Sequence, residues 1–469
     1  MTSRADTAME EPAEDPRQLA ALRRFGADAV SFQSLESGLA WWYDAPGPDG
    51  TGAALAYRDT GRSWIAVGRP LVEAASTARA ARRFADAARA QRRRAVFFGV
   101  EQVDALPDFR RLALGVESVL LPEHWPATLA ASRKLREQLR RARAKGVTVR
   151  LASAAEVAPG TTLRGEIERL GREWLAARPM EPMGFLVAVE PFHAADHHLY
   201  VVAERRGEVV QVLSAVPAFA RRGWLFEDML RGPDAPNGTT ELVLDLALRT
   251  IAGRAAWATP GLTPLTGPIA WWLRAARSLT TPLYDFDGLR RFRARLAPAR
   301  WIPVWLVWDR GPAVFVLVDV LRAFAGGPLA AFAWRSLTRH PNGPPWAVAL
   351  PLVPWTGLLI GLLPAGAAGT LGFSAGALAG WAIFDVALAW LLFRAARRPV
   401  RRHLLWLALA AAVDAAISLH HLAARGLGPD ATSAVLRLAA TAGPVVGTAA
   451  LAWAAHLARP RHRPVTRPG

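Results

Sequence analysis

The residues best suited to chemistry are concentrated in one stretch, 224–249. Asp228 and Arg231 are three positions apart, a spacing that would place both side chains on one face of a helical turn. Carboxylates exchange protons and guanidinium groups bind anions, so the pair is a candidate for either task. A cluster of Gly, Pro, Asp and Asn at 232–238 then predicts a turn. The alternative is an ordinary loop between a strand and a helix.

An amphipathic helix is expected directly after this turn. Thr239 or Thr240 is the expected N-cap, and apolar residues recur at helical spacing over 241–252. Such a helix would fix the end of the turn against the body of a domain.

A second feature is a strongly basic segment, 133–150, which contains one acid, Glu137. At 3.6 residues per turn its cations form one stripe and its leucines form the packed stripe, with Gly146 placed to end the helix. The density of one sign favours a phosphate-contacting surface over a merely solvated face. The cations of this surface are Arg133, Lys134, Arg136, Arg140 and Arg143.

Metal and nucleotide motifs give weaker signals. The segment HAADHH at 193–198 holds three imidazoles, but it is not expected to form a helix that would align an i,i+4 His pair, and the chain has no cysteine, so we expect no metal site and no cofactor. The sequence also contains no P-loop, no dinucleotide fingerprint and no G-x-S-x-G motif. These absences argue against a P-loop nucleotidase and a serine hydrolase.

Composition points to an anionic partner. The 469 residues include 57 Lys+Arg against 39 Asp+Glu, a formal net charge of +18. Such a balance suits nucleic acid or an anionic membrane surface. The lack of cysteine excludes disulfides and thiol chemistry.

The first part of the chain predicts an α+β fold. Residues 1–16 are polar and are expected to be a disordered tail, and 17–130 alternates strand-like runs with a helix over 73–93. The runs SFQSL, LAWWYD, AALAYRD and SWIAVGRP are expected to form an antiparallel sheet, followed by the strand AVFFGVE. A second α+β unit is expected over 131–310, including two strands joined at Arg206 and Gly207.

The last part of the chain predicts a membrane anchor. Residues 311–344 are expected to hold an interfacial helix and a linker, with a buried core helix as the alternative. Four apolar segments follow within 345–460, each long enough to span a bilayer, and 461–469 is a basic tail. The loop 394–402 is rich in Arg. The positive-inside rule therefore predicts that this loop and both termini lie on the cytoplasmic side of an inner or plasma membrane.

Several motifs, in this order, resemble the synthase domain of phosphatidylglycerol lysyltransferases, the cytoplasmic half of multiple peptide resistance factor proteins. They are FGADAVSFQSL, AYRDTGRSWIAVGRP, AVFFGVE, GVESVLL, RKLREQLRRARAKG, EPMGF, DMLRGPDAPNGTTE, GLTPLTG and YDFDGLRRF. The resemblance covers the chain from about Arg17 to Pro328.

The resemblance implies tandem acetyltransferase-like (GNAT) folds before a four-helix transmembrane bundle. It implies transfer of an aminoacyl group from aminoacyl-tRNA to a glycerol hydroxyl of phosphatidylglycerol. Asp228 or Glu227 would then be the base or would orient the ammonium group, Arg231 would clamp a phosphate, and the basic helix would hold the tRNA. The other substrate-binding residues expected from the matched motifs are Glu181, Phe185, Asn237, Gly238 and Glu241.

The chain departs from the family pattern in two ways. Glu241 stands where the family usually has Asp, with Thr240 before it in place of Met. The apolar bundle follows the synthase-like part, whereas a flippase region precedes it in full-length relatives. The alternative function is a non-catalytic membrane scaffold or sensor that binds anionic lipid or RNA, and a transferase acting on peptide amines is a third possibility.

Overall fold

The computed structural model describes residues 15–44, 52–178, 180–280, 285–339, 341–362, 374–427 and 431–458. The expected tail 1–16 lies almost wholly outside these residues, and the basic tail 461–469 lies wholly outside them. The chain divides into two compact units. The first comprises residues up to 178 together with 182–328, and the second comprises 179–181 together with the chain from Leu329 onward.

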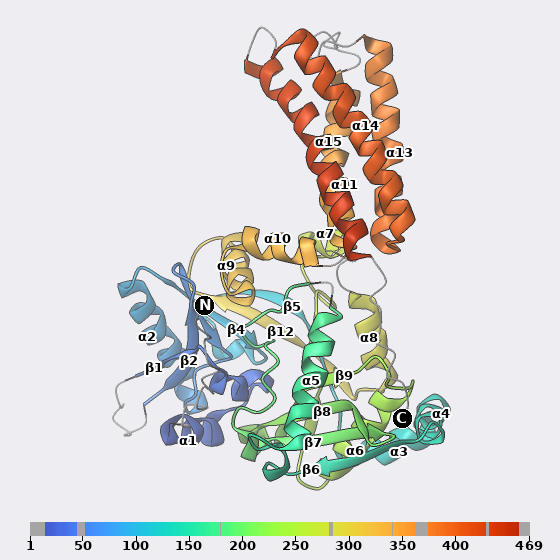
Figure 1. Ribbon diagram of the computed structural model, residues 1–469. Helices are drawn as coiled ribbons and strands as arrows, with labels where there is room; N and C mark the ends of the chain where they lie inside the picture. The colour runs from blue at the N-terminus through green and yellow to red at the C-terminus, as the bar shows by residue number, and fades with distance from the viewer. Residues whose placement is uncertain are drawn as a thin grey trace, which may run out of the picture. The chain divides into compact units, whose positions relative to one another are not determined.

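The first unit contains a seven-stranded sheet (Figure 1). Its strands, in spatial order, are β1 (Ala40–Tyr43), β2 (Ala54–Asp59), β3 (Ser63–Val67), β4 (Arg94–Val100), β12 (Arg300–Trp308), β5 (Arg110–Val119) and β11 (Leu262–Pro264). Helix α2 (Thr77–Ala90) buries Phe84 against one face, and α9 (Ala313–Ala325) buries Val316 and Val320 against the other. Strand β3 is buried along its whole length and β4 is buried from Ala95 onward, as expected for strands covered on both faces.

One expectation for this sheet is wrong. The run SFQSL forms not a strand but part of a 3-10 helix, η1 (Ala29–Leu35), in which polar and apolar residues are buried alike, so their alternation does not mark a half-exposed strand. The next three runs form β1, β2 and β3, which pair antiparallel as expected, and β4 then pairs in parallel with β3 across the crossover helix α2. In addition, β11 and β12 join this sheet from beyond residue 130, so the expected boundary at 130 divides the sequence but not the sheet.

A five-stranded sheet forms the second half of the first unit. Its strands, in spatial order, are β10 (Trp257–Thr259), β9 (Gly223–Arg231), β8 (Glu208–Ala218), β7 (Leu199–Arg205) and β6 (Val147–Ala152). Strands β7 and β8 confirm the hairpin expected at Arg206 and Gly207, where both residues have positive φ. Strand β9 pairs antiparallel with β8 and in parallel with β10.

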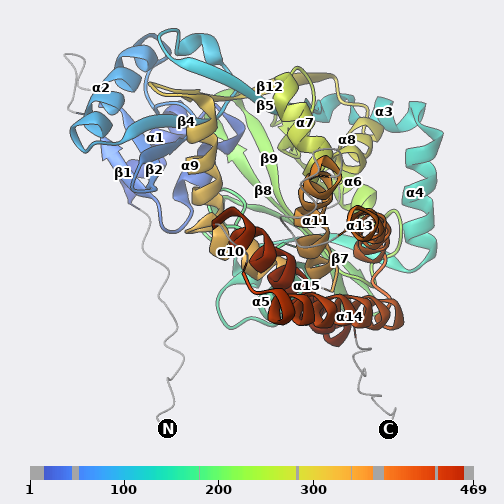
Figure 2. The same cartoon turned by 90° about the horizontal axis from the view of Figure 1, so that it is seen from above.

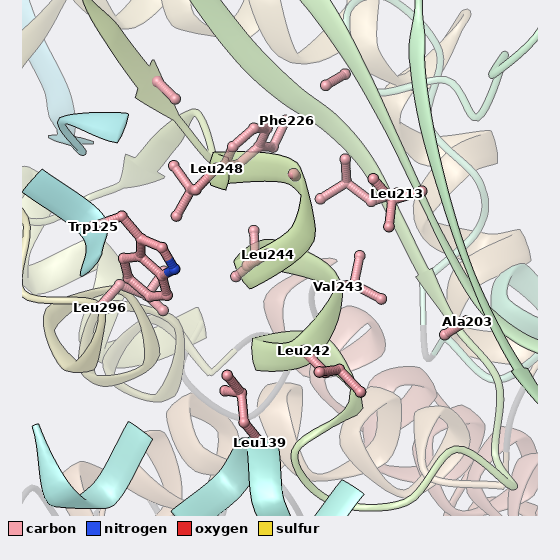
Figure 3. Packing of buried hydrophobic residues seen from close by; sticks show 14 of the residues in the cluster. Trp125, Leu139, Ala203, Leu213, Phe226, Leu242, Val243, Leu244, Leu248 and Leu296 are labelled. Atoms are coloured by element: carbon pink, nitrogen blue, oxygen red, sulfur yellow. The ribbon is translucent and has the colours of Figure 1, made fainter. Parts of the chain in front are cut away.

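Helices cover both faces of this second sheet. On one face, α6 (Thr239–Ile251) packs Leu244 and Leu248 against Leu213 and Phe226 (Figure 3). On the other face, α5 (Thr162–Ala176) packs on Leu230 and its neighbours. Helices α3 (Trp125–Ala131) and α4 (Arg133–Ala144) lie beside α6 (Figure 2). The remaining helices of the first unit are α1 (Pro16–Phe25), α7 (Trp271–Thr280) and α8 (Phe286–Arg295).

The helical turn expected for Asp228 and Arg231 is wrong, because both residues belong to β9. The strand is specified by its pairing with β8, which local spacing within 228–231 does not reveal. On a strand, residues three positions apart point to opposite faces. The pair therefore serves two different faces of the sheet.

The second unit is helical. After α10 (Leu329–Arg339) it contains α11 (Gly343–Leu362), α13 (Ala375–Arg397), α14 (Arg401–Arg425) and α15 (Ala431–Leu457). These last four are long and apolar enough to cross a membrane, and α9 with α10 would count as a fifth span if taken as one. Asp385 and Asp414 are buried in the bundle, and Arg437 donates to the carbonyl groups of Arg425 and Gly426.

Helix α9 occupies part of the expected interfacial segment. One of its faces is core, where the carboxylate of Asp319 accepts from Ser63 Oγ at 2.7 Å and lies 3.1 Å from Arg94 Nη1. Its other face exposes Val314, Phe315 and Leu321. These contacts pair the buried carboxylate of Asp319, which interrupts the apolar sequence of α9, with polar groups of the first sheet. That α9 lies at a membrane interface stays a prediction.

Replacing Leu244 with Ala should lower the apparent Tm of the purified full chain by at least about 5 °C. The side chain is fully buried between α6 and the second sheet, and the resulting cavity costs about 2–5 kcal/mol. Scanning fluorimetry measures the shift, with Leu151→Ala on the exposed side of β6 as the control. Equal shifts in the two variants would contradict the packing described for α6.

Candidate active site

A β-bulge in β9 organises the acidic side chains. Asp228 pairs with Ser214 of β8, but the next pair joins Ala215 to Phe226, so Glu227 has no residue opposite it. An extra residue in one strand bends the strand locally and re-aims its side chains. Both Glu227 and Asp228 consequently interact with the carboxylates of two other segments.

We call these four carboxylates, Glu36, Glu190, Glu227 and Asp228, the acidic cluster. Glu36 accepts hydrogen bonds from Gln33 Nε2 at 3.0 Å and from the Leu186 backbone N–H at 2.8 Å. Glu190 accepts from the backbone N–H and the Oγ of Ser37, at 3.2 and 2.7 Å. Both oxygens of Glu227 and Oδ2 of Asp228 are buried without a hydrogen-bond partner. The cluster thus has unused acceptor capacity.

Burial and mutual repulsion change how these groups ionise. Burial, and then the charge of Glu190, raise the pKa of Asp228 to about 7. Burial raises the pKa of Glu36 to about 8, and burial with the charges of Asp228 and Glu36 raises the pKa of Glu227 well above its ordinary value. Removing a carboxylate from water disfavours its charged form, so the cluster favours a bound cation or retained protons.

The three imidazoles of HAADHH take different positions. Burial, followed by the neighbouring His193, lowers the pKa of His198 to about 3, so this ring is neutral. His193, His198 and Glu227 each offer a ligand atom, and these atoms lie within 4.8 Å of one another. The third member comes from β9, which spacing within HAADHH could not indicate. The expectation of no metal site considered HAADHH alone and did not include Glu227.

A pocket of about 390 Å³, which we call the basic pocket, lies at the N-terminus of α6. Its cations come from α4, β9 and α8, and a helix N-terminus itself attracts anions. Arg231 is held in place by a 2.7 Å hydrogen bond to the carbonyl of Ala235. The lining residues are Ser132, Lys134, Leu135, Gln138, Arg141, Arg231, Asn237, Gly238, Thr240, Glu241, Phe292 and Arg295.

Gly238 is the N-cap of α6, which corrects the expectation of Thr239 or Thr240. Its φ is +94°, and a Cβ there would lie 2.1 Å from the carbonyl oxygen of Gln138 in α4. Only glycine permits this close approach at positive φ. Thr239 instead donates to the carbonyl of Pro236, and Thr240 donates to Gln211.

The acidic cluster and the basic pocket use opposite sides of β9. Asp228 and Arg231 are about 10 Å apart along the strand, from its rise per residue. Strand β10 pairs with β9 only at Gly223–Leu225, so the edge of β9 from Phe226 onward has no pairing strand among the described residues.

The other predicted site residues have different surroundings. Glu181 belongs to the second unit, where its oxygens lie 3.7 Å from Arg335 and 3.3 Å from Arg339. Phe185 is buried against Phe98 and Phe324 in the core of the first sheet.

The basic helix is present as α4, with its leucines buried and all five predicted cations exposed. Lys134 lines the basic pocket. Arg136 donates to the carbonyl of Leu129, and Arg143 lies 3.6 Å from Asp245. Arg141 and Arg295 of the pocket were not predicted as site residues, and Glu36 and Glu190 of the cluster carried no sequence signal, because only the tertiary fold brings them to β9.

Two α+β halves, followed by four helices long and apolar enough to cross a membrane, define the class as a membrane protein with an α+β domain. The sequence profile of the family "phosphatidylglycerol lysyltransferase, C-terminal" matches residues 24–308, more than half of the 469 residues. The chain therefore belongs to this family.

Individual proteins agree with this assignment. The bifunctional lysylphosphatidylglycerol biosynthesis protein LysX of Mycolicibacterium vanbaalenii is 28% identical over 215 residues, which cover 42% of this chain and 19% of that protein. The chain thus spans about a fifth of this relative.

Two solved structures share the fold, each with a TM-score of 0.55 and each covering 66% of this chain. One is the C-terminal domain of a protein from Agrobacterium fabrum described as a lysylphosphatidylglycerol synthetase, at 22% identity. The other is L-PGS from Bacillus licheniformis, at 21% identity. The match covers 97% of either structure, so both α+β halves correspond.

The buried carboxyl group of Glu117, on β5, should make the stability of the folded chain depend on pH. Burial, and then the charge of Glu101, raise its pKa to about 8, from 4.5 for an exposed glutamate. The folded state therefore binds more protons than the unfolded state between these values, and stability falls as pH rises from about 5 to 8. Glu117→Gln should reduce this loss of apparent Tm, whereas the exposed Glu208→Gln should leave it unchanged. An unaltered pH profile in Glu117→Gln would contradict the assignment.

Proposed function

We propose that this chain transfers an aminoacyl group, most simply lysyl, from aminoacyl-tRNA to a glycerol hydroxyl of phosphatidylglycerol. The observation that carries the proposal is that an acidic cluster and a basic pocket share the strand β9 in a member of the phosphatidylglycerol lysyltransferase family. A cationic acyl group and a polyanionic carrier need surroundings of opposite sign, and β9 contributes Asp228 to the first and Arg231 to the second.

The chemistry demands little more than alignment and proton transfer. An aminoacyl ester is already activated, so the lipid hydroxyl can attack its carbonyl carbon once both are aligned. The hydroxyl proton passes to Asp228, and a proton returns to the ribose oxygen as the ester bond to tRNA breaks. A pKa of about 7 suits Asp228 to both steps, since a general base works best near the ambient pH.

The acidic cluster also suits the acyl group. A lysyl ester carries ammonium groups at both ends of its side chain, and Glu36 and Glu190 lie beside Asp228 to receive one of them. A bound ammonium would offset the cost of burying neighbouring carboxylates. Glu227, whose pKa burial raises well above its ordinary value, lies beside Asp228 in the cluster and is not assigned the proton transfer.

The basic pocket suits the carrier. Arg231 can bind a phosphate through two hydrogen bonds, and Lys134 and Arg141 extend the pocket onto α4. The exposed cations of α4 continue this surface along the helix, as contacts to an RNA backbone require. The edge of β9 beyond Leu225 would let the aminoacyl end pass toward Asp228.

The apolar helices would hold the enzyme at its lipid substrate. With the loop 394–402 facing the cytoplasm, four spans place the catalytic half on the side where charged tRNA is found. Helix α9 would contact the cytoplasmic leaflet through its exposed apolar side chains, Val314, Phe315 and Leu321.

Lipid analysis tests the transfer. Cells expressing the chain should accumulate a cationic aminoacyl-phosphatidylglycerol detectable by mass spectrometry, and Asp228→Asn should reduce it about 100-fold or more. Asp234→Asn, an exposed residue of the adjoining turn, is the matched control and should retain the product. Extracts unchanged by expression, together with binding of anionic vesicles, would instead support a scaffold.

Binding of labelled tRNA tests the donor. Arg231→Ala should weaken binding roughly 10-fold and lower the slope of log affinity against log salt by about 1, since one phosphate contact is lost. Arg172→Ala, an exposed arginine on α5, is the control and should behave like the wild type. Product formation that survives RNase treatment, or tRNA affinity insensitive to Arg231, would exclude tRNA as the donor at this pocket.

A further inference from the structure

We infer that His193, His198 and Glu227 form a site for one zinc ion, beyond the proposed transfer function. The candidate ligand atoms of the three side chains lie within 4.8 Å of one another. Two imidazoles and one carboxylate are a donor set that zinc binds with a fourth position open to water or substrate. Bonds of about 2.0–2.1 Å in a tetrahedron place ligand atoms about 3.4 Å apart, so zinc binding would shorten separations of up to 4.8 Å by at most about 1.4 Å.

The donor atoms are buried and unused. Nε2 of His193, Nε2 of His198 and both carboxylate oxygens of Glu227 have no hydrogen-bond partner. Asp228, whose side chain is 8% exposed, directs a further unpartnered oxygen, Oδ2, into the same region. A buried polar atom without a partner costs about 1–3 kcal/mol, so several such acceptors at one place favour binding of a cation.

The second nitrogen of each imidazole is anchored. Nδ1 of His193 lies 2.7 Å from the carbonyl oxygen of Glu190, which can only accept, so Nδ1 carries the proton and Nε2 presents its lone pair. Nδ1 of His198 lies 2.6 Å from Ser214 Oγ, on the strand beside β9. Orientation of a ligating histidine through its other nitrogen is a regular feature of metal sites.

The surroundings hold the rings in this geometry. Phe32 of η1 contacts both rings, with centroid distances of 6.0 Å to His193 and 5.7 Å to His198. His198 also stacks on Tyr200, whose hydroxyl donates to the carbonyl of Pro191 at 2.6 Å. Such fixed side chains lose little freedom on binding an ion.

His197 provides an internal comparison. It belongs to the same segment, but its ring lies against Phe32 and Phe219, and it is not part of the triad. A divalent ion at the triad would also lie next to three other carboxylates of the acidic cluster and offset their repulsion. The site therefore suits a cation on grounds of donors, orientation and charge.

The test is zinc binding by the full chain, purified in detergent and stripped with chelator. We expect one equivalent of zinc by elemental analysis, and a visible spectrum of tetrahedral type when cobalt replaces it. His193→Ala and His198→Ala should each weaken zinc affinity about 100-fold or more, and Ser214→Ala about 10-fold. His197→Ala should bind zinc like the wild type.

Two outcomes would overturn the site. One is a wild type that binds zinc no more tightly than the His193→Ala, His198→Ala double variant. The other is an equal loss in His197→Ala, which would indicate non-specific binding. Melting curves recorded without metal show whether each variant is folded. Where an alanine variant is not folded, the nearly isosteric Glu227→Gln replaces it in the binding measurement. Because no tRNA or lipid is present, failure here leaves the transfer proposal standing, and the reverse also holds.

Discussion

The structure depends on one local irregularity, the bulge at Glu227 in β9. Without the extra residue, Glu227 and Asp228 would point to opposite faces, and one of them would enter the apolar layer beneath α6. With it, both carboxylates join Glu36 and Glu190, and burial, followed by repulsion among these groups, raises their pKa values. Buried carboxylates placed close together are unfavourable without a counter-charge. We therefore interpret the acidic cluster as a binding site for a positively charged group.

The two α+β halves are joined in a way that supports this strand. β11 and β12 return from the C-terminal half to complete the first sheet, and η1 of the N-terminal half packs Phe32 with Val216 and Leu225 of the second sheet. Phe32 of η1 contacts the histidines that precede β7. The site is thus built from both halves, and neither half alone contains it.

Much of the fold follows from sequence periodicity, but the site does so only in part. The hairpin at Arg206, the basic helix and the four apolar helices have strong local patterns and were predicted. The conformation of Asp228 was not, because three-residue spacing fits a helical turn and the deciding contacts come from β8. The partners Glu36 and Glu190 could not be found from sequence, since nothing local marks a carboxylate that tertiary packing will bury.

The central claim is that one strand holds the acyl group at the acidic cluster and the carrier's phosphate at the basic pocket. The most direct measurement is a structure of the chain with a non-hydrolysable lysyl amide of 3′-amino-adenosine 5′-phosphate. The account predicts an ammonium group within hydrogen-bond distance of Asp228 or Glu36, and the phosphate against Arg231 and Lys134. Binding of the analogue away from β9, or with its phosphate at the acidic cluster, would contradict it.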